Sequence, residues 1–195
     1  MLKTSKNTPD TEKKQAILEA ALQLITENGF HNAPMSVLAK KAGVAAGTIY
    51  HHFSGKEEII NALYAFGKAN MGAALQRGDD PSLPYRQRFE SVWMSLFNHF
   101  TRHPAEFLFL EQYANSPFIT QVTKEQNMRF YQPTVDLLRE GVKKGKLRKM
   151  DSELMVALVY GDIVTCIKLH LSGELKMTPA RVKQALASSW DGVRA

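Results

Sequence analysis

The sequence is poor in the residues on which many enzymes and secreted proteins depend. A single cysteine, Cys166, excludes an internal disulfide and any zinc site built from cysteines. The chain contains no Gly-Lys-Ser/Thr phosphate loop, no Gly-x-Ser-x-Gly nucleophile elbow, and no cysteine and histidine that stand out as a nucleophile and its base. We therefore expect no enzymatic activity, no catalytic residues and no cofactor.

A pair of histidines is the pattern that comes nearest to a metal site. His99 and His103 lie four residues apart, so they would share a helix face, with Glu106 nearby. The segment lacks the glutamate of a zinc-protease helix, and Pro104 ends the turn. We expect two ordinary histidines at a helix end and no bound metal.

Long apolar runs and strand patterns are also absent. The sequence has no stretch of about 18 consecutive apolar residues, and its polar N-terminus has no signal-peptide core. No segment alternates polar and apolar residues for long enough to form a strand. With 195 residues and a hydrophobic content of 44%, we expect an all-α globular protein in the cytoplasm, with no membrane partner.

The net charge of +6 is concentrated away from the N-terminal third. Residues 1–60 carry seven lysines and six acidic residues, for a net charge of +1. Much of the remaining +5 lies in one short region, formed by Arg139, Lys143, Lys144, Lys146, Arg148 and Lys149. We interpret this region as a solvated helix end and loop, since cations are favourable near a helix C-terminus. A second contact with DNA or lipid is the alternative.

The most informative stretch is residues 35–56. Its first apolar residues recur at i, i+3, i+4 and i+7, the spacing of one buried helical face, and Gly43 then supplies the left-handed backbone that ends a helix. A second short helix opens at residues 45–48 and directs Ile49 into the core. Helix, short glycine-containing turn and helix make up a helix-turn-helix unit, whose second helix enters the major groove of DNA.

The same stretch resembles the DNA-reading segment of the TetR family of transcriptional regulators. The matching residues, in order, are Met35–Val44, Gly47–Phe53 and Lys56–Ile59, a dense and specific match. One departure is Pro34, where the family usually has a Ser or Thr that caps the helix. Proline suits the first helical turn, so the cap is left to a neighbour such as Asn32. The resemblance is tight over about residues 10–60 and loose thereafter.

The resemblance implies two domains and a set of DNA contacts. We expect a three-helix helix-turn-helix domain over residues 1–60 and a helical effector-binding and dimerisation domain over residues 61–195. Because the N-terminal end of the recognition helix enters the groove, residues 46–48 should approach base edges, and residues that follow them should contact phosphates. The predicted DNA-binding residues are Ser36, Lys41, Ala46, Gly47, Thr48, Tyr50, His51 and Lys56.

Beyond the helix-turn-helix the chain reads as a series of amphipathic helices. A helix over about residues 56–77 ends at a turn cluster, residues 78–82, which is the clearest break. A complete apolar stripe over residues 89–100 needs a large core. Another helix should run from about residue 117 toward 144, kinked or split by Pro133.

The helix expected from Leu154 to Leu171 is apolar on nearly all sides. A helix that is hydrophobic all round is buried all round, so it is either the central helix of the core or part of a dimer seam. The resemblance favours the seam, because TetR-like proteins dimerise through their last two long helices as a four-helix bundle. The predicted dimer residues are Leu154, Leu158, Gly161, Thr165, Leu169, Val182, Leu186 and Trp190.

Large aromatic residues are concentrated between Trp93 and Tyr131. Core packing is the default interpretation, yet these are many large side chains for one small helical domain. An apolar cavity with a few polar groups is what a small-molecule site requires, and in the TetR family the middle helices enclose the effector pocket. The predicted ligand-binding residues are Trp93, Phe97, Phe100, Phe107, Leu110, Tyr113, Phe130 and Tyr131.

Together these patterns predict a homodimeric, TetR-like repressor. It would bind a palindromic double-stranded DNA operator and release it when a small, largely apolar effector binds. One alternative is a small-molecule-binding sensor protein that has lost operator binding, against which the retained Gly47, Thr48 and Tyr50 count. Another is a global nucleoid-associated DNA binder, which would lack a pocket.

Overall fold

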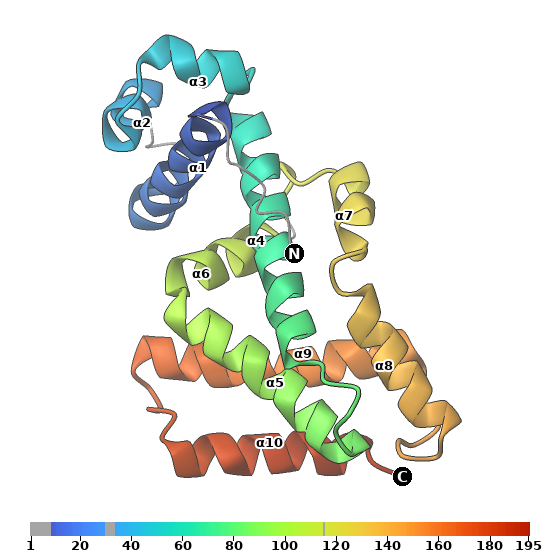
Figure 1. Ribbon diagram of the computed structural model, residues 1–195. Coiled ribbons are helices and arrows are strands. Elements are labelled where there is room, and N and C mark those ends of the chain that lie inside the picture. The colour runs from blue at the N-terminus through green and yellow to red at the C-terminus, as the bar shows by residue number, and fades with distance from the viewer. Residues whose placement is uncertain (1–8, 30–33, 115) are drawn as a thin grey trace. The chain divides into compact units, whose positions relative to one another are not determined.

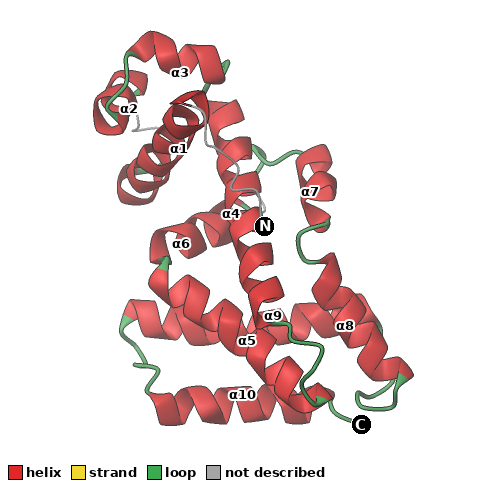
Figure 2. Ribbon diagram, in the orientation of Figure 1, coloured by secondary structure: helices red, strands yellow, loops and turns green. Residues whose placement is uncertain are grey.

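The computed structural model describes residues 9–29, 34–114 and 116–195, which form ten helices (Figure 1, Figure 2). Within these residues no β-strand occurs, and one antiparallel bridge joins Leu147 and Arg194. The all-α prediction is confirmed. In chain order the helices are α1 (Pro9–Asn28), α2 (Met35–Ala42), α3 (Ala46–His52), α4 (Lys56–Gly78), α5 (Tyr85–Arg102), α6 (Pro104–Tyr113), α7 (Gln121–Met128), α8 (Gln132–Lys143), α9 (Ser152–Ser172) and α10 (Pro179–Val193).

The helices divide into two compact units. The first comprises Met1–Gly67 with Ala105–Lys124, and the second comprises Lys68–Pro104 with Glu125–Ala195. The long helix α4 therefore supplies residues to both units. The domain boundary predicted at residue 60 falls within this same helix.

In the first unit, α1 packs against α2 and α3. Its buried side carries Ile17, Ala21 and Leu24, at the spacing of one helical face. Helix α2 begins directly after Pro34, whose carbonyl oxygen accepts two N–H groups of the first turn at 3.0 Å. No side chain caps α2, and Asn32, the suggested cap, lies outside the described residues. The backbone of Pro34 thus takes over part of the role of the missing Ser or Thr.

In the second unit, α5 packs against α9 and α10, and α8 packs against α9. The predicted apolar stripe of α5 is buried as a whole, which explains why this amphipathic helix is stable. The ring of Trp190 on α10 lies edge-on to Phe89, with 5.3 Å between the ring centroids. The buried residues of α5 are Phe89, Val92, Trp93, Leu96, Phe97 and Phe100.

Between α6 and α9 the chain forms two helices, as the split predicted at Pro133 requires, but the first of them begins later than residue 117. Helix α7 begins only at Gln121, and the chain then turns over residues 129–131 before α8 starts. Pro133 lies in the first turn of α8, where its missing N–H has no helical partner to lose. Proline therefore splits the predicted helix, and the split leaves Phe130 and Tyr131 in the turn.

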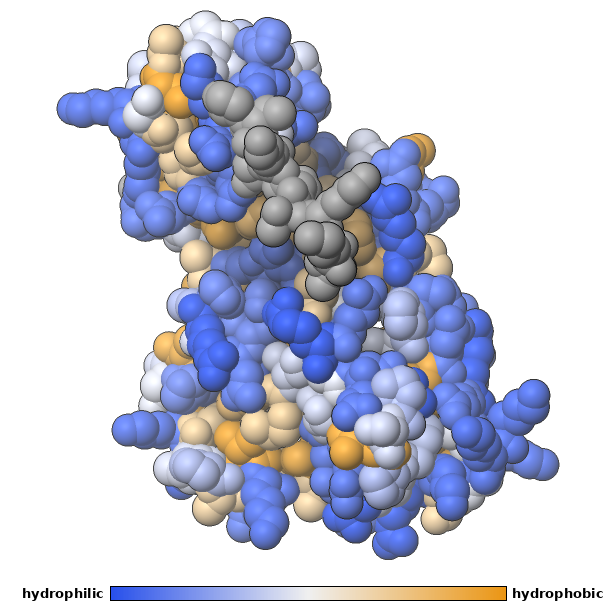
Figure 3. Space-filling view, viewed as in Figure 1, coloured by the Kyte–Doolittle hydropathy of each residue, from blue (hydrophilic) through white to orange (hydrophobic). Residues whose placement is uncertain are grey.

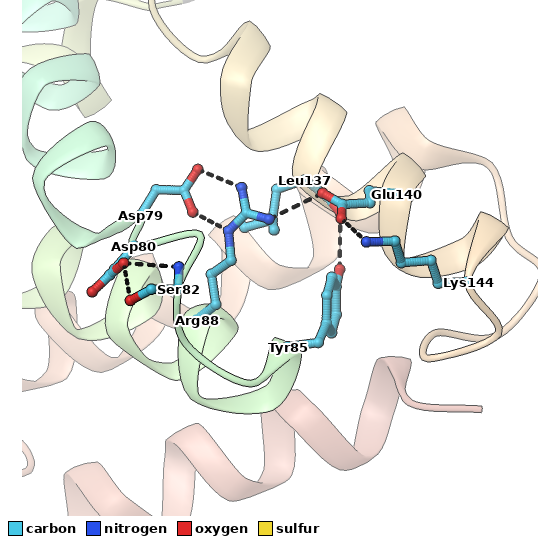
Figure 4. Close-up of polar contacts among 8 residues, drawn as sticks. All are labelled: Asp79, Asp80, Ser82, Tyr85, Arg88, Leu137, Glu140 and Lys144. Carbon is cyan, nitrogen blue, oxygen red and sulfur yellow. Dashed lines mark hydrogen bonds and ion pairs between the residues drawn. The ribbon is translucent and has the colours of Figure 1, made fainter.

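A nearly buried arginine joins three segments of the second unit (Figure 4). Arg88 on α5 has 14% of its side chain exposed and donates two hydrogen bonds to Asp79, which follows α4, one of them at 2.9 Å. Its Nη1 also donates to Glu140 on α8 at 3.0 Å. Tyr85 donates its hydroxyl hydrogen to the carbonyl of Leu137 at 2.9 Å. The bonds to Asp79 raise the pKa of the Arg88 guanidinium, and burial raises the pKa of the Tyr85 hydroxyl.

Helix α9 is apolar on two sides, but only one of them is covered within the chain. Met155, Ile163 and Ile167 face the core and are at most 2% exposed. On another side Leu154 and Leu158 are 52% and 50% exposed. By length and composition α9 is also the one described helix that could cross a membrane, which for a single helix is weak support for a span.

Candidate nucleic-acid interface

Helices α2 and α3 form a helix-turn-helix. Gly43 has the left-handed φ of 66°, and its N–H bonds to the carbonyls of Ala39 and Lys40 at the end of α2. The N–H of Val44 also reaches the Ala39 carbonyl, at 3.0 Å. A side chain at Gly43 would be strained at this φ, so the glycine sets the direction in which α3 leaves the turn.

The N-terminal end of α3 is open to solvent. Ala46 and Gly47 are exposed, and a β-carbon at Gly47 would meet no atom within 4 Å. Ile49 is fully buried and fixes the opposite side of the helix, while Tyr50 is 58% exposed. A short, slim helix end that projects from a packed base is the shape that a major groove admits.

Contacts with α1 and α4 hold the far end of α3. His52 Nε2 lies 3.4 Å from a carboxylate oxygen of Asp10 at the start of α1. After α3, the N–H and hydroxyl of Ser54 donate to Glu58 on α4 at 2.7 and 2.8 Å. These two hydrogen bonds lower the pKa of the Glu58 carboxyl. Because α3 has only seven residues, such neighbours rather than its own hydrogen bonds must fix its orientation.

The predicted DNA-binding residues are accessible to different degrees. Thr48 and Lys56 are half-buried. The stem of Lys56 lines a small cavity of about 20 Å³ in the first unit, which has room for a water molecule only. Lys41 pairs with Glu27 at 3.1 Å. The residues that are exposed are Ser36, Lys41, Ala46, Gly47, Tyr50 and His51.

Two exposed residues of α2 were not among the predicted contacts. Lys40 is exposed beside Lys41, and Val37 is 44% exposed. The sequence could have indicated them, because Val37 and Lys40 directly flank the buried residues Leu38 and Ala39 of α2. Lys40 therefore joins the candidates for a phosphate contact.

The predicted ligand-binding residues are apolar and mostly buried, but they belong to different units. Trp93, Phe97 and Phe100 lie on α5 in the second unit, with the rings of Trp93 and Phe97 stacked at 5.6 Å. The α6 residues are buried in the first unit. Phe130 and Tyr131 are half-buried in the turn before α8. The predicted α6 residues are Phe107, Leu110 and Tyr113.

Trp93 carries an unusual polar atom. Its indole Nε1 is buried, yet no hydrogen-bond acceptor reaches it in the described part of the chain. A buried N–H without an acceptor costs about 1–3 kcal/mol. Such groups are rare in native proteins, so this buried donor calls for a physical explanation.

The predicted dimer residues divide into exposed and covered groups. Leu154, Leu158 and Thr165 are exposed on α9. A β-carbon at Gly161, on the same helix, would meet no atom within 4 Å. Val182 and Trp190 are each only 8% exposed, because they pack inside the second unit. The remaining two, Leu169 and Leu186, are half-buried.

His99 lies on α5, and His103 directly follows the end of that helix. The rings of His99 and His103 are 4.9 Å apart. In the described residues no group of three or more His, Cys, Asp or Glu side chains gathers as a metal site would require.

A helix-turn-helix followed by an all-helical body defines a DNA-binding transcriptional regulator. The sequence model of the bacterial regulatory proteins of the tetR family matches residues 17–63, and the model of the tetracyclin repressor-like C-terminal domain matches residues 68–195. The chain belongs to the TetR family. Its members are transcriptional regulators, a class that is not generally enzymatic.

Relatives of known sequence and structure agree with this assignment. The chain is 28% identical over 164 residues to the fatty acid metabolism regulator protein of Bacillus subtilis, covering 77% of this chain and 79% of the relative. It is 25% identical over 150 residues to the transcriptional regulator UidR of Escherichia coli, covering 74% and 76%. A tetR family transcription regulator from Shewanella sp. PV-4 has 29% identity and a TM-score of 0.83, covering 94% and 98%.

Proposed function

We propose that this regulator is a ligand-responsive repressor that binds a palindromic operator as a homodimer and leaves it when a small apolar effector binds. The observation that carries the proposal is the exposed N-terminal end of α3, which projects from a base fixed by the buried Ile49. Because the family binds DNA, we take this end as the part that reads the operator, inside the cytoplasm.

The residues of this surface have separable roles in the proposal. Thr48 and the backbone of Gly47 approach base edges, while Tyr50, His51 and Lys56 contact phosphates. Phosphate contacts position the protein, and base contacts specify the sequence. Lys56→Ala should weaken all duplexes alike and reduce the salt slope by about one charge, whereas Thr48→Ala should change sequence preference. Equal losses across all duplexes for both variants would overturn these roles.

The homodimer in the proposal uses the exposed side of α9 together with α10. Leu154 and Leu158 are large aliphatic residues that are half exposed on the single chain. Clustered apolar surface of this kind is typical of protein contacts, and in the region of α9 and α10 apolar surface lies among hydrophilic side chains (Figure 3). A twofold dimer presents two copies of α3, which matches a palindromic operator.

The effector in the proposal is largely apolar and carries one hydrogen-bond acceptor. The aromatic residues of α5 supply the apolar surface, and the buried Trp93 Nε1 supplies a donor that has no acceptor. The relative from Bacillus subtilis is named as a regulator of fatty acid metabolism. A long-chain fatty acid, with its apolar chain and terminal carboxylate, is therefore the first effector to test.

The proposal requires that effector binding changes operator affinity. A ligand can shift affinity only through a difference between its affinities for the two states, and the coupling is reciprocal. Helix α4 is the candidate lever, because it starts in the first unit and ends in the second. Coupling of this kind is worth about 1–3 kcal/mol, or about 5- to 150-fold in operator affinity.

The test is an operator titration with and without palmitate. Binding of palmitate is followed by isothermal titration calorimetry, because a tryptophan variant would lose a fluorescent reporter, and operator affinity should fall at saturating palmitate. Trp93→Phe should weaken palmitate binding, whereas Trp190→Phe is the matched control. If palmitate binds and operator affinity stays the same, the proposed switch is wrong for this ligand class.

A further inference from the structure

The end of α8 and the turn that follows it carry most of the net charge of the chain. Residues 139–149 contain six arginines and lysines and one acid, Glu140, so they hold +5 of the total charge of +6. Hydrophilic side chains project from this part of the second unit at the lower right of Figure 3. We name residues 143–149 the basic turn.

The basic turn is held in place by the body of the second unit. Leu147, in its middle, is only 2% exposed and forms the bridge with Arg194. The N–H of Arg148 donates to the carbonyl of Val193 at 2.9 Å. Gly145 makes the reversal, with a φ of 64°. The cations therefore project from a turn whose backbone is tied to the end of α10.

Three lysines of the basic turn have no neutralising partner. Lys143, Lys146 and Lys149 are exposed, and no carboxylate forms an ion pair with them in the described residues. Arg148 donates its Nη2 to the Asp191 carbonyl at 3.1 Å, which leaves its charge in place. Lys144 alone is paired, with Glu140.

The helix end explains only part of this cluster. Helix α8 ends at Lys143, and the favourable interaction of cations with a helix C-terminus falls off within the last turn. Lys146, Arg148 and Lys149 lie beyond that turn. Since like charges so close together repel each other, an anionic partner would relieve this repulsion.

The chemistry of the turn favours a phosphate backbone as that partner. Leu147 is buried, so the turn exposes no apolar or aromatic side chain. Interfacial binding to membranes depends on apolar residues as well as cations, and single-stranded nucleic acid depends on aromatic stacking. Point charges without such residues suit the regular phosphates of a duplex.

We propose that the basic turn is a second DNA-binding surface, which contacts the phosphates of duplex DNA independently of the helix-turn-helix. A regulator bound at its operator is surrounded by further duplex at high effective concentration, so even weak contacts are occupied. The contact is independent of base sequence, because phosphates carry no sequence information directly.

The test compares salt dependence in matched variants. Binding of full-length protein to a short duplex of random sequence is measured by fluorescence anisotropy at several salt concentrations. Lys146→Gln/Lys149→Gln should make the slope of log K against log salt shallower by about 1.8, since each lost phosphate contact removes about 0.9. The control Lys176→Gln/Lys183→Gln removes two exposed lysines elsewhere in the second unit and should leave the slope unchanged.

Two further measurements test whether the positive charge is what matters and whether the partner is DNA or an anionic lipid surface. Lys146→Arg/Lys149→Arg keeps the charge and should keep the wild-type slope. Equal slopes for wild type and the Gln variant would overturn the proposal. Vesicles of phosphatidylcholine with phosphatidylglycerol are the second probe: a loss of vesicle binding by the Gln variant, with its duplex slope unchanged, would assign the turn to an anionic lipid surface instead. Neither result depends on an effector or on the predicted operator.

Discussion

Replacement of Gly141 by alanine tests the packing of the second unit most sharply. A β-carbon at Gly141 would collide with the hydroxyl oxygen of Tyr85, and it would lie 2.5 Å from Cζ of the same ring and 2.7 Å from Cδ1 of Leu147. Real β-carbons do not approach other atoms so closely. Either the tyrosine or α8 must move, and the hydrogen bond from Tyr85 to the Leu137 carbonyl, 2.9 Å long, is then lost or bent.

The size of the effect follows from three contributions. A glycine-to-alanine change in a helix stabilises by up to about 1 kcal/mol. Overpacking costs about 1–3 kcal/mol, and loss of the tyrosine hydrogen bond costs about 0.5–1.5 kcal/mol. We therefore expect Gly141→Ala to lower the free energy of unfolding by about 1–3 kcal/mol, although the same change elsewhere in a helix stabilises.

The assay is urea unfolding followed by far-ultraviolet circular dichroism at fixed protein concentration, because a dimer would make stability depend on concentration. Gly192→Ala is the control, since a β-carbon there meets nothing within 4 Å. Tyr85→Phe removes the colliding oxygen. It should therefore lower the free energy of unfolding less in the Gly141→Ala variant than in the wild type. If Gly141→Ala is as stable as the wild type, the close contact between Gly141 and the Tyr85 ring is wrong.

Three further predictions concern the dimer, a helix cap and acid stability. Leu158→Glu should leave the chain folded, because this residue is 50% exposed. Light scattering should show a monomer, since the proposed dimer interface would bury an unpaired charge. A folded dimer would exclude this interface. Asp151→Ala should cost about 1 kcal/mol in urea unfolding, because its carboxylate accepts two N–H groups of α9 at 3.0 and 2.9 Å, and Asp151→Asn should retain most of that stability. Hydrogen bonds from Lys144 and then Arg88 lower the pKa of Glu140 from 4.5. A lowered folded-state pKa adds stability above the ordinary value that is lost as the pH falls through the folded value, so the stability difference between wild type and Glu140→Gln should shrink below pH 4.5 and persist at neutral pH.

Local patterns in the sequence predicted the helix-turn-helix formed by α2 and α3 well. The turn between α2 and α3 depends on Gly43 and on the buried Ile49, and both signals lie within a few residues of each other. Helix caps depend on nearest neighbours in the same way: the side chains of Asp151 and Thr178 accept N–H groups at the starts of α9 and α10. Such features are fixed by nearest neighbours, so they can be read without the tertiary structure.

Features that depend on distant neighbours could not be read in this way. Arg88 and Glu140 are 52 residues apart in sequence, and no local pattern in either segment predicts their ion pair. Periodicity showed that Trp93 and Phe107 are buried, but it could not show that they belong to different units. Composition showed that α9 is apolar all round, yet only the packing shows that Leu158 is exposed on the single chain.

Selection of bound duplexes from a random library shows whether two chains bind a palindromic operator through α3. We expect enrichment of an inverted repeat with half-sites about one helical turn apart or a little more. The mass of the complex should show two chains bound to it. Enrichment should fail for Thr48→Ala or shift to another sequence. If no sequence is recovered above background, or if an asymmetric site is bound by one chain, this protein does not bind a palindromic operator as a homodimer through α3.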